Sequence, residues 1–119
     1  MVHLILVSHH PALAQALAEL AAQVSADPAT LHTAAGIDDA DNPIGTDAVR
    51  IMNAIDAADN PDGILILVDL GSAILSAQTA LELVDPDVAA RCRIAAAPFV
   101  EGALSAAVAA VLERRRARR

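Results

Sequence analysis

The sequence predicts an α/β protein, a doubly wound three-layer sandwich around a central, mainly parallel sheet of four strands in the order 2-1-3-4. Two short runs of branched apolar residues, 4–7 and 64–68, are typical of strands buried on both faces. A helical pattern follows each run, and alternating strands and helices favour a parallel sheet with helices on both sides. The order 2-1-3-4 makes the first and third strands neighbours at the point where the winding reverses.

Length and composition restrict the chain to one domain with a core of its own, since it has 119 residues. Hydrophobic residues make up 55%, but they include one Phe and no Tyr or Trp, so Ala, Leu, Ile and Val must build the core. No apolar run approaches the ~18 residues of a membrane span, and no basic segment precedes 2–7 as in a signal peptide. Cys92 is the single cysteine, which excludes an internal disulfide framework. We therefore expect a cytoplasmic protein that does not bind membranes.

Charge is unevenly distributed along the chain, whose formal net charge is −7. All fifteen acidic residues and three arginines lie in 1–113, whereas the other five arginines lie in 114–119. This acidic excess argues against nucleic acid as a partner of the domain. We predict a domain over 1–113 and a basic C-terminal tail over 114–119. The tail either contacts phosphates or complements the negative end of the last helix.

The first half of the chain shows two strand–helix units. Pro11 suits the first turn of a helix, and helical spacing continues through 12–24 at Leu13, Leu17, Leu20 and Val24, with Ala16 and Ala21 in the same stripe. A weak strand is expected at 30–35, followed by a loop at 36–45 rich in Asp, Asn, Pro and Gly. Thr46 is the expected N-cap of a second helix. The predicted buried stripe of that helix consists of Val49, Ile51, Met52 and Ile55.

The second half repeats the pattern. The run 64–68 is the most apolar strand and is expected at the centre of the sheet. A third helix follows, with apolar positions at Ile74, Leu75, Ala80, Leu81 and Val84, and Asp85-Pro86 ends or interrupts it. A modest fourth strand is expected at 93–97. An Ala-rich helix from about Val100 then runs into the arginines.

His9 and Asp69 each follow a predicted strand directly, and we interpret them as the catalytic pair. Open α/β sheets place ligand sites beyond the carboxyl ends of their strands, so the order 2-1-3-4 brings these two side chains together. A histidine that accepts a phosphoryl group needs one nucleophilic nitrogen, a partner for the other nitrogen, and donors for the phosphate oxygens. Asp69 would accept from Nδ1–H of His9 and leave Nε2 free.

Two predicted helix starts offer donors to the phosphate. Backbone N–H groups of Gly71, Ser72, Gly45 and Thr46 are candidates, together with the hydroxyls of Ser72 and Thr46. Residues near His9 are candidates for a surface that contacts partner proteins: His10, Leu70, Ile74 and Leu75.

Other interpretations of these residues stay open. His9 could be a cap or a surface residue, and Asp69 could cap the third helix. Neither glycine-containing loop is a Walker loop, the four histidines lack zinc-ligand spacing, and no Gly-x-Ser-x-Gly elbow occurs. We therefore predict no metal site and no serine nucleophile. The residues by themselves indicate a small α/β domain with an anion-binding crevice.

Five motifs resemble the mannose-type enzyme IIA family and, within it, the DhaM phosphotransfer subunits of dihydroxyacetone kinases that depend on the phosphotransferase system. They are VSH at 7–9, AGIDD at 35–39, NPIGTD at 42–47, DLGSA at 69–73 and APFVEG at 97–102. The family carries its phosphoryl group on a histidine after the first strand, which matches His9 rather than His10. The family aspartate after the third strand matches Asp69.

The resemblance implies a homodimeric phosphotransferase subunit that works through a phosphohistidine. HPr would phosphorylate His9, and His9 would pass the group to ADP held in the DhaL subunit, while DhaK presents dihydroxyacetone. This chain would bind no nucleotide or other cofactor itself. Because it ends after the enzyme IIA domain, we expect separate general proteins to supply the phosphoryl group. The alternatives are an enzyme IIA of a sugar permease, and a non-phosphorylated regulatory module of the same fold.

Overall fold

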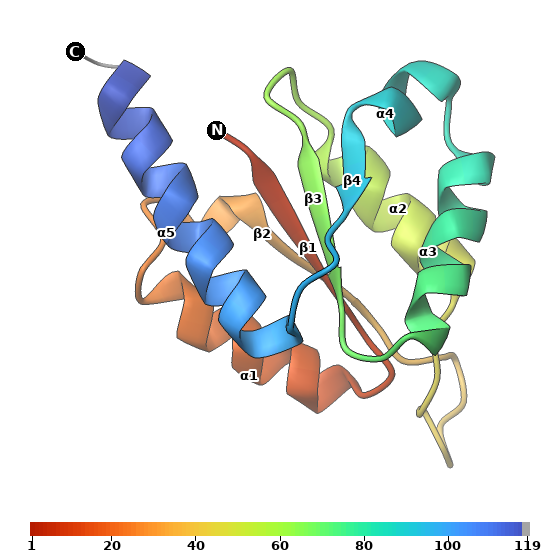
Figure 1. Ribbon diagram of the computed structural model, residues 1–119. Coiled ribbons are helices and arrows are strands. Elements are labelled where there is room, and N and C mark those ends of the chain that lie inside the picture. The colour runs from red at the N-terminus through yellow and green to blue at the C-terminus, as the bar shows by residue number, and fades with distance from the viewer. Residues whose placement is uncertain (118–119) are drawn as a thin grey trace.

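The computed structural model describes residues 1–117 and consists of three layers, with one sheet between two layers of helices (Figure 1). The sheet has the order β2-β1-β3-β4, and its three strand pairings are all parallel. Its strands are β1 (His3–Ser8), β2 (Leu31–Ala35), β3 (Ile64–Val68) and β4 (Cys92–Ile94). The predicted fold class and strand order are confirmed.

Helices cover both faces of the sheet. One layer holds α1 (Pro11–Ala22) and α5 (Phe99–Ala117), which pack on each other and on the central strands (Figure 1). The other layer holds α2 (Ala48–Ala58), α3 (Ser72–Leu83) and the short α4 (Pro86–Ala90). A 3-10 turn, Pro28–Thr30, precedes β2. No helix among residues 1–117 is long and apolar enough to cross a membrane.

The two central strands are apolar over 4–7 and 64–68 because both of their faces are buried there. Ile5 and Ile66 pack in the core beneath α2 and α3, whereas Leu6 and Leu67 pack against the α1 and α5 layer. Burial of each such side chain contributes about 1.5–3 kcal/mol. The helices present alanines to the sheet, among them the fully buried Ala73, which let the layers approach closely.

The helices bury the predicted stripes only in part. On α1, Leu17 and Ala21 are buried as predicted, together with Ala14, while Leu13 and Leu20 are more than 40% exposed, as is Val24 beyond the end of the helix. On α2 the stripe is right for Ile51 and Ile55, partly right for Met52, and wrong for Val49, which is exposed. Small residues occupy the positions that face the sheet because a helix can then lie nearer to it.

Element boundaries also differ in places. Asp47, not Thr46, is the N-cap of α2, and its carboxylate accepts from the N–H of Val49 at 2.8 Å. The predicted fourth strand is shorter, because the chain leaves the sheet after Ile94. Pro86 opens the additional helix α4, as Pro does at the first helical position.

The arginine-rich segment continues the last helix within the described residues. Arg114, Arg115 and Arg116 lie in the last turns of α5, where positive charge complements the helix dipole. Arg118 and Arg119 of the predicted tail lie outside the described residues.

Candidate functional site

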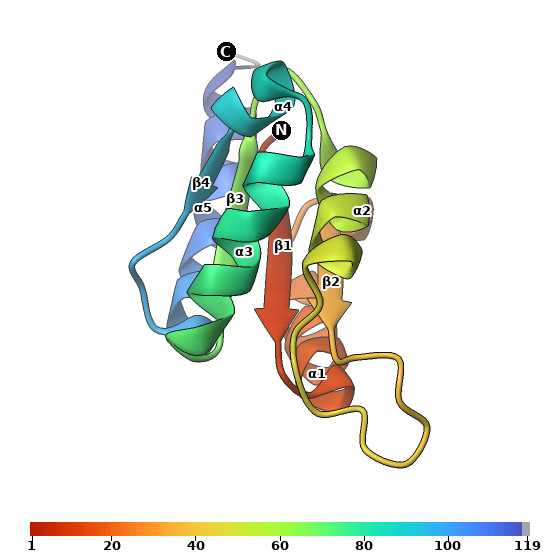
Figure 2. The ribbon, with the colours of Figure 1, turned by 90° about the vertical axis from the view of Figure 1, so that its right-hand side faces the viewer.

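The register of β1 and β3 brings the predicted catalytic residues together. Val7 pairs with Val68, so the residues that follow leave the sheet side by side, and the N–H of Asp69 donates to the carbonyl oxygen of Val7 at 3.1 Å. The starts of α1 and α3 and the loop between β2 and α2 lie at this same end of the sheet (Figure 2). This is where an open α/β sheet places its ligand site.

His9 and Asp69 form a close pair. Nδ1 of His9 lies 2.9 Å from Oδ1 of Asp69, and the other carboxylate oxygen, Oδ2, accepts from the backbone N–H of His9 at 2.9 Å. The His9 side chain is 21% exposed and that of Asp69 is 9% exposed, so a partner protein can reach the imidazole but not the carboxylate.

Hydrogen bonds keep the carboxylate charged. Burial by itself raises the pKa of Asp69, but the N–H and the ring of His9 together with the hydroxyl of Ser8 outweigh that effect, so the pKa lies below its ordinary value. An ionised Asp69 accepts a hydrogen bond from Nδ1–H of His9. The lone pair of the neutral ring is then on Nε2. The sequence-based assignment of the two nitrogens agrees with this geometry.

Nε2 of His9 has a partner of its own, contrary to the expectation that it is free. The Ser72 hydroxyl oxygen lies 2.9 Å from it, and the lone pair of Nε2 makes Ser72 the donor. Ser72 is the first residue of α3. Its hydroxyl must rotate away from Nε2 before phosphorus can approach, and it then lies within reach of the phosphate oxygens.

His10 has the opposite arrangement of its two nitrogens. It is the N-cap of α1, and its Nδ1 accepts from the N–H of Ala12 at 3.1 Å. In the neutral ring the proton therefore resides on Nε2, the nitrogen left for solvent. Of the two neighbouring histidines, only His9 has a nucleophilic lone pair on Nε2.

The start of α3 offers free donors for a phosphoryl group. The N–H groups of Gly71 and Ser72 have no acceptor among the described residues. A Cβ at Gly71 would meet nothing within 4 Å, so space is open there. Backbone N–H groups at a helix start attract anions.

The second predicted donor site has other partners. The N–H of Gly45 donates to the carbonyl oxygen of His9 at 2.8 Å, and the Thr46 hydroxyl pairs with that of Ser76 at 2.7 Å. Both residues therefore hold the loop between β2 and α2 against the site. Contrary to the prediction, the Gly45 N–H is not available to phosphate.

Gly36 was not singled out from the sequence as a site residue, yet it fixes the same loop. Its φ is +74°, and a Cβ there would lie 2.6 Å from Cγ of Pro11. Its N–H donates to the carbonyl oxygen of Ser8 at 3.1 Å. A glycine at the end of a strand, directly before a loop rich in turn-forming residues, is the sequence signal for such a close approach.

Exposed apolar side chains surround the start of α3. Leu70 and Leu75 of the candidate partner surface are 58% and 68% exposed, and His10 is exposed as well. Ile74 differs, because it is partly buried and packs on the core. Ile44, in the loop bound to His9 through Gly45, is also exposed.

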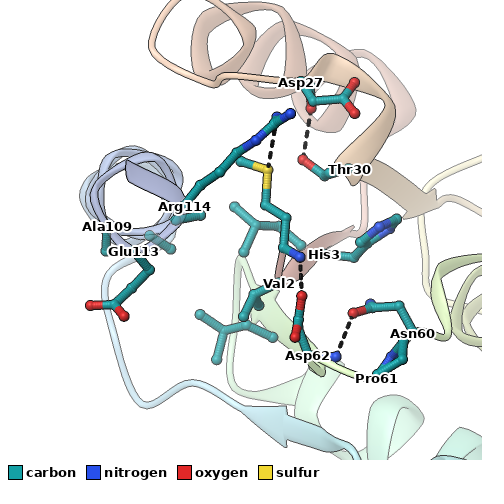
Figure 3. A pocket seen from close by; sticks show the side chains of 15 residues that line it. Val2, His3, Asp27, Thr30, Asn60, Pro61, Asp62, Ala109, Glu113 and Arg114 are labelled. Carbon is teal, nitrogen blue, oxygen red and sulfur yellow. Dashed lines mark hydrogen bonds and ion pairs between the residues drawn. The ribbon is translucent and has the colours of Figure 1, made fainter. Parts of the chain in front are cut away.

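A hollow of about 850 Å³ lies at the other end of the sheet (Figure 3). It is lined by the first residues of β1, the turn before β3 and the last turns of α5, and His9 is not part of it. Met1 reaches across it, with its sulfur near Arg114 and its amino group on Asp62. Residues 1–117 contain no group of three or more metal-ligating side chains. This hollow is therefore separate from the partly exposed His9 ring.

This fold and this histidine–aspartate pair define a class, the enzyme IIA domains of the phosphotransferase system. The profile of the EIIA-man family, described as "PTS system fructose IIA component", matches residues 3–118, and the chain belongs to that family. The narrower resemblance to DhaM is confirmed by its relatives. A "PEP-dependent dihydroxyacetone kinase, phosphoryl donor subunit DhaM" of Escherichia coli (strain K12) is 51% identical over 111 residues, which are 92% of this chain.

The relatives differ in length. This chain spans only 24% of the Escherichia coli protein. It spans 85% of "PEP-dependent dihydroxyacetone kinase 2, phosphoryl donor subunit DhaM" of Listeria innocua serovar 6a, which is 40% identical over 108 residues, 91% of this chain. A solved structure described as "unknown function protein EF1359" aligns with a TM-score of 0.77 and 29% identity, covering 93% of this chain and 83% of that one.

Proposed function

We propose that this chain is the phosphoryl carrier of a dihydroxyacetone kinase, a phosphotransferase subunit that works through phosphohistidine at His9. HPr donates the group to Nε2, and His9 passes it to ADP bound in the DhaL subunit. The resulting ATP phosphorylates dihydroxyacetone presented by DhaK. The observation that carries the proposal is the contact of Nδ1 of His9 with Asp69, at 2.9 Å, in a partly exposed ring beside free N–H groups at the start of α3.

The chemistry requires one bond to form and one to break at each step. The lone pair of Nε2 attacks phosphorus, the N–P bond forms, and the bond between phosphorus and the donor breaks. The proton on Nδ1 stays in place, so the ring becomes cationic and Asp69 stabilises it. The N–H groups of Gly71 and Ser72 and the released Ser72 hydroxyl bind the phosphoryl oxygens. An oxygen of ADP then attacks phosphorus and the neutral imidazole leaves.

The names of the relatives support dihydroxyacetone as the final acceptor. The family description, "PTS system fructose IIA component", favours a second candidate, an enzyme IIA that passes its phosphoryl group to the IIB domain of a sugar permease. The two differ in the acceptor alone, because the histidine chemistry is the same.

We propose that nucleotide enters the cycle only on DhaL, that this chain binds no cofactor, and that the cycle runs in the cytoplasm. The exposed Leu70 and Leu75, with His10, form the surface that HPr and DhaL use in turn. The acidic domain has no nucleic acid or membrane partner in this scheme.

We also propose that the chain is a homodimer. The layer formed by α1 and α5 exposes a set of large apolar side chains: Leu13, Leu20, Val24, Val108 and Leu112. An apolar surface of this kind is typical of a face that another protein covers, and paired copies of one chain are the commonest solution.

Labelling tests the first half of the cycle. With phosphoenolpyruvate, enzyme I and HPr, the wild-type chain should acquire one acid-labile, base-stable phosphate. His9→Ala should abolish it, while the matched His10→Ala variant should keep it. Label that survives in His9→Ala would refute the assignment, and no label in the wild type would favour the regulatory module.

Transfer tests the second half. The phosphorylated chain should keep its label in the presence of dihydroxyacetone and lose it when ADP-loaded DhaL is added. With DhaK and dihydroxyacetone present, dihydroxyacetone phosphate should form with catalytic amounts of nucleotide. Direct transfer to dihydroxyacetone would contradict the carrier function, and transfer to a mannose-type enzyme IIB would favour the permease.

A further inference from the structure

Ser8 is a polar residue at the end of an apolar strand, and its side chain is fully buried. Among residues 1–117, the only other buried polar side chain is that of Thr30, at the opposite end of the sheet. Buried hydroxyls are almost always hydrogen-bonded, and the Oγ atom of Ser8 lies against the catalytic pair. It is 2.9 Å from Oδ2 of Asp69 and 3.1 Å from both the carbonyl oxygen and the nitrogen of His10.

The single proton of this hydroxyl has to go to one of two acceptors, Asp69 or the His10 carbonyl. The carbonyl already accepts from the N–H of Ala14 at 3.2 Å. An ionised carboxylate is the stronger acceptor, so Ser8 donates to Oδ2. The hydroxyl oxygen in turn accepts the N–H of His10, which fixes the orientation of the Ser8 hydroxyl.

We infer that Ser8 is a positioning residue for phosphoryl transfer, because its hydroxyl holds the Asp69 carboxylate in the orientation that directs Oδ1 at Nδ1 of His9. Oδ2 receives two donors, the Ser8 hydroxyl and the His9 N–H, and Oδ1 remains for the ring. Ser8 belongs to β1, a central strand, so the carboxylate is held by a rigid element rather than by a loop. The inference rests on the proposed transfer at His9.

The titration of Asp69 in the isolated protein provides a readout that needs no partner. Followed by 13C NMR of the carboxyl carbon, its midpoint should move to higher pH in Ser8→Ala, because one donor to the ionised form is lost. Ser8→Thr, which keeps a hydroxyl, should return it toward the wild-type value. Asp59, whose lowered pKa depends chiefly on Arg91, should titrate unchanged in both variants. An unmoved Asp69 midpoint in Ser8→Ala would overturn the inference.

Transfer kinetics provide the second readout. Ser8→Ala should slow phosphorylation by HPr about tenfold, the lower end of what the loss of an outer hydrogen bond costs at metal-bound histidines. Thr30→Val is the matched control, since it removes a buried hydroxyl that donates to the carbonyl of Asp27, and it should transfer at the wild-type rate. Equal rates for Ser8→Ala and the wild type would overturn the inference. If the wild type takes no phosphate at all, the proposed function fails, and the Asp69 titration still tests whether the Ser8 hydroxyl holds the Asp69 carboxylate.

Discussion

Asp69 has to remain charged in a nearly buried position beside the ring that becomes cationic. Asp69→Asn preserves the size of the side chain and an oxygen for Nδ1 of His9. The amide nitrogen then replaces Oδ2, so the Ser8 hydroxyl turns to the His10 carbonyl 3.1 Å away, and the His9 N–H loses its acceptor. We therefore expect the variant to fold and to transfer phosphate about 10²-fold more slowly or worse, on the scale of acid–base contributions. Stopped-flow or quench-flow transfer from phosphorylated HPr measures this.

Asp47→Asn is the control for Asp69→Asn, because Asp47 caps α2 and asparagine caps as well as aspartate. Its transfer rate should match the wild type, and wild-type kinetics in Asp69→Asn would remove Asp69 from the mechanism.

The pH dependence of folding stability has a definite sign. The lowered pKa of Asp69 contributes stability above the ordinary carboxyl pKa, and this stability is lost as the pH falls through the lowered value. Asp69→Asn should therefore unfold with less dependence on pH in that acidic range.

At the scale of elements, the site depends on a loop with no regular structure. The segment between β2 and α2 is bound to the end of β1 at two points, through the N–H of Gly36 on Ser8 and the N–H of Gly45 on His9. These contacts fix the backbone from which the His9 side chain projects.

Gly36→Ala should destabilise the protein by about 1–3 kcal/mol, because φ is +74° and the new Cβ would collide with Pro11. Urea denaturation measures the change. Gly71→Ala is the control for stability, since Gly71 has helical backbone angles and open space around its Cβ position. Equal stability of the two variants would show that the loop tolerates a side chain at position 36.

For the whole molecule, the apolar outer face of the α1 and α5 layer predicts a dimer at micromolar concentration by light scattering. Leu20→Glu should shift the mass toward the monomer, because a charge would be buried in the interface. Leu83→Glu changes a leucine of similar exposure in the other helical layer, and it should leave the dimer intact. A monomeric wild type would contradict the proposal.

The sequence by itself determined the fold class, the strand order and the pairing of His9 with Asp69. Those features follow from local patterns: apolar runs mark central strands, and residues directly after parallel neighbours must meet at one edge of the sheet. The helix faces were harder to predict, because α1 buries Ala14 and leaves Leu13 and Leu20 outside. Hydrophobicity alone does not tell which of two apolar faces fits closer to a sheet.

Only the tertiary structure decided which hydrogen bonds hold the site together. The Ser72 hydroxyl donates to Nε2 of His9, and the N–H of Gly45 donates to the His9 carbonyl rather than to phosphate. The buried Ser8 hydroxyl donates to the carboxylate of Asp69. His3 and His32, which the sequence left without a role, meet across β1 and β2 at 2.9 Å between ring nitrogens. Hydrogen-bond partners of this kind are distant in sequence and depend on distances of a few tenths of an ångström, which residue type and spacing do not encode.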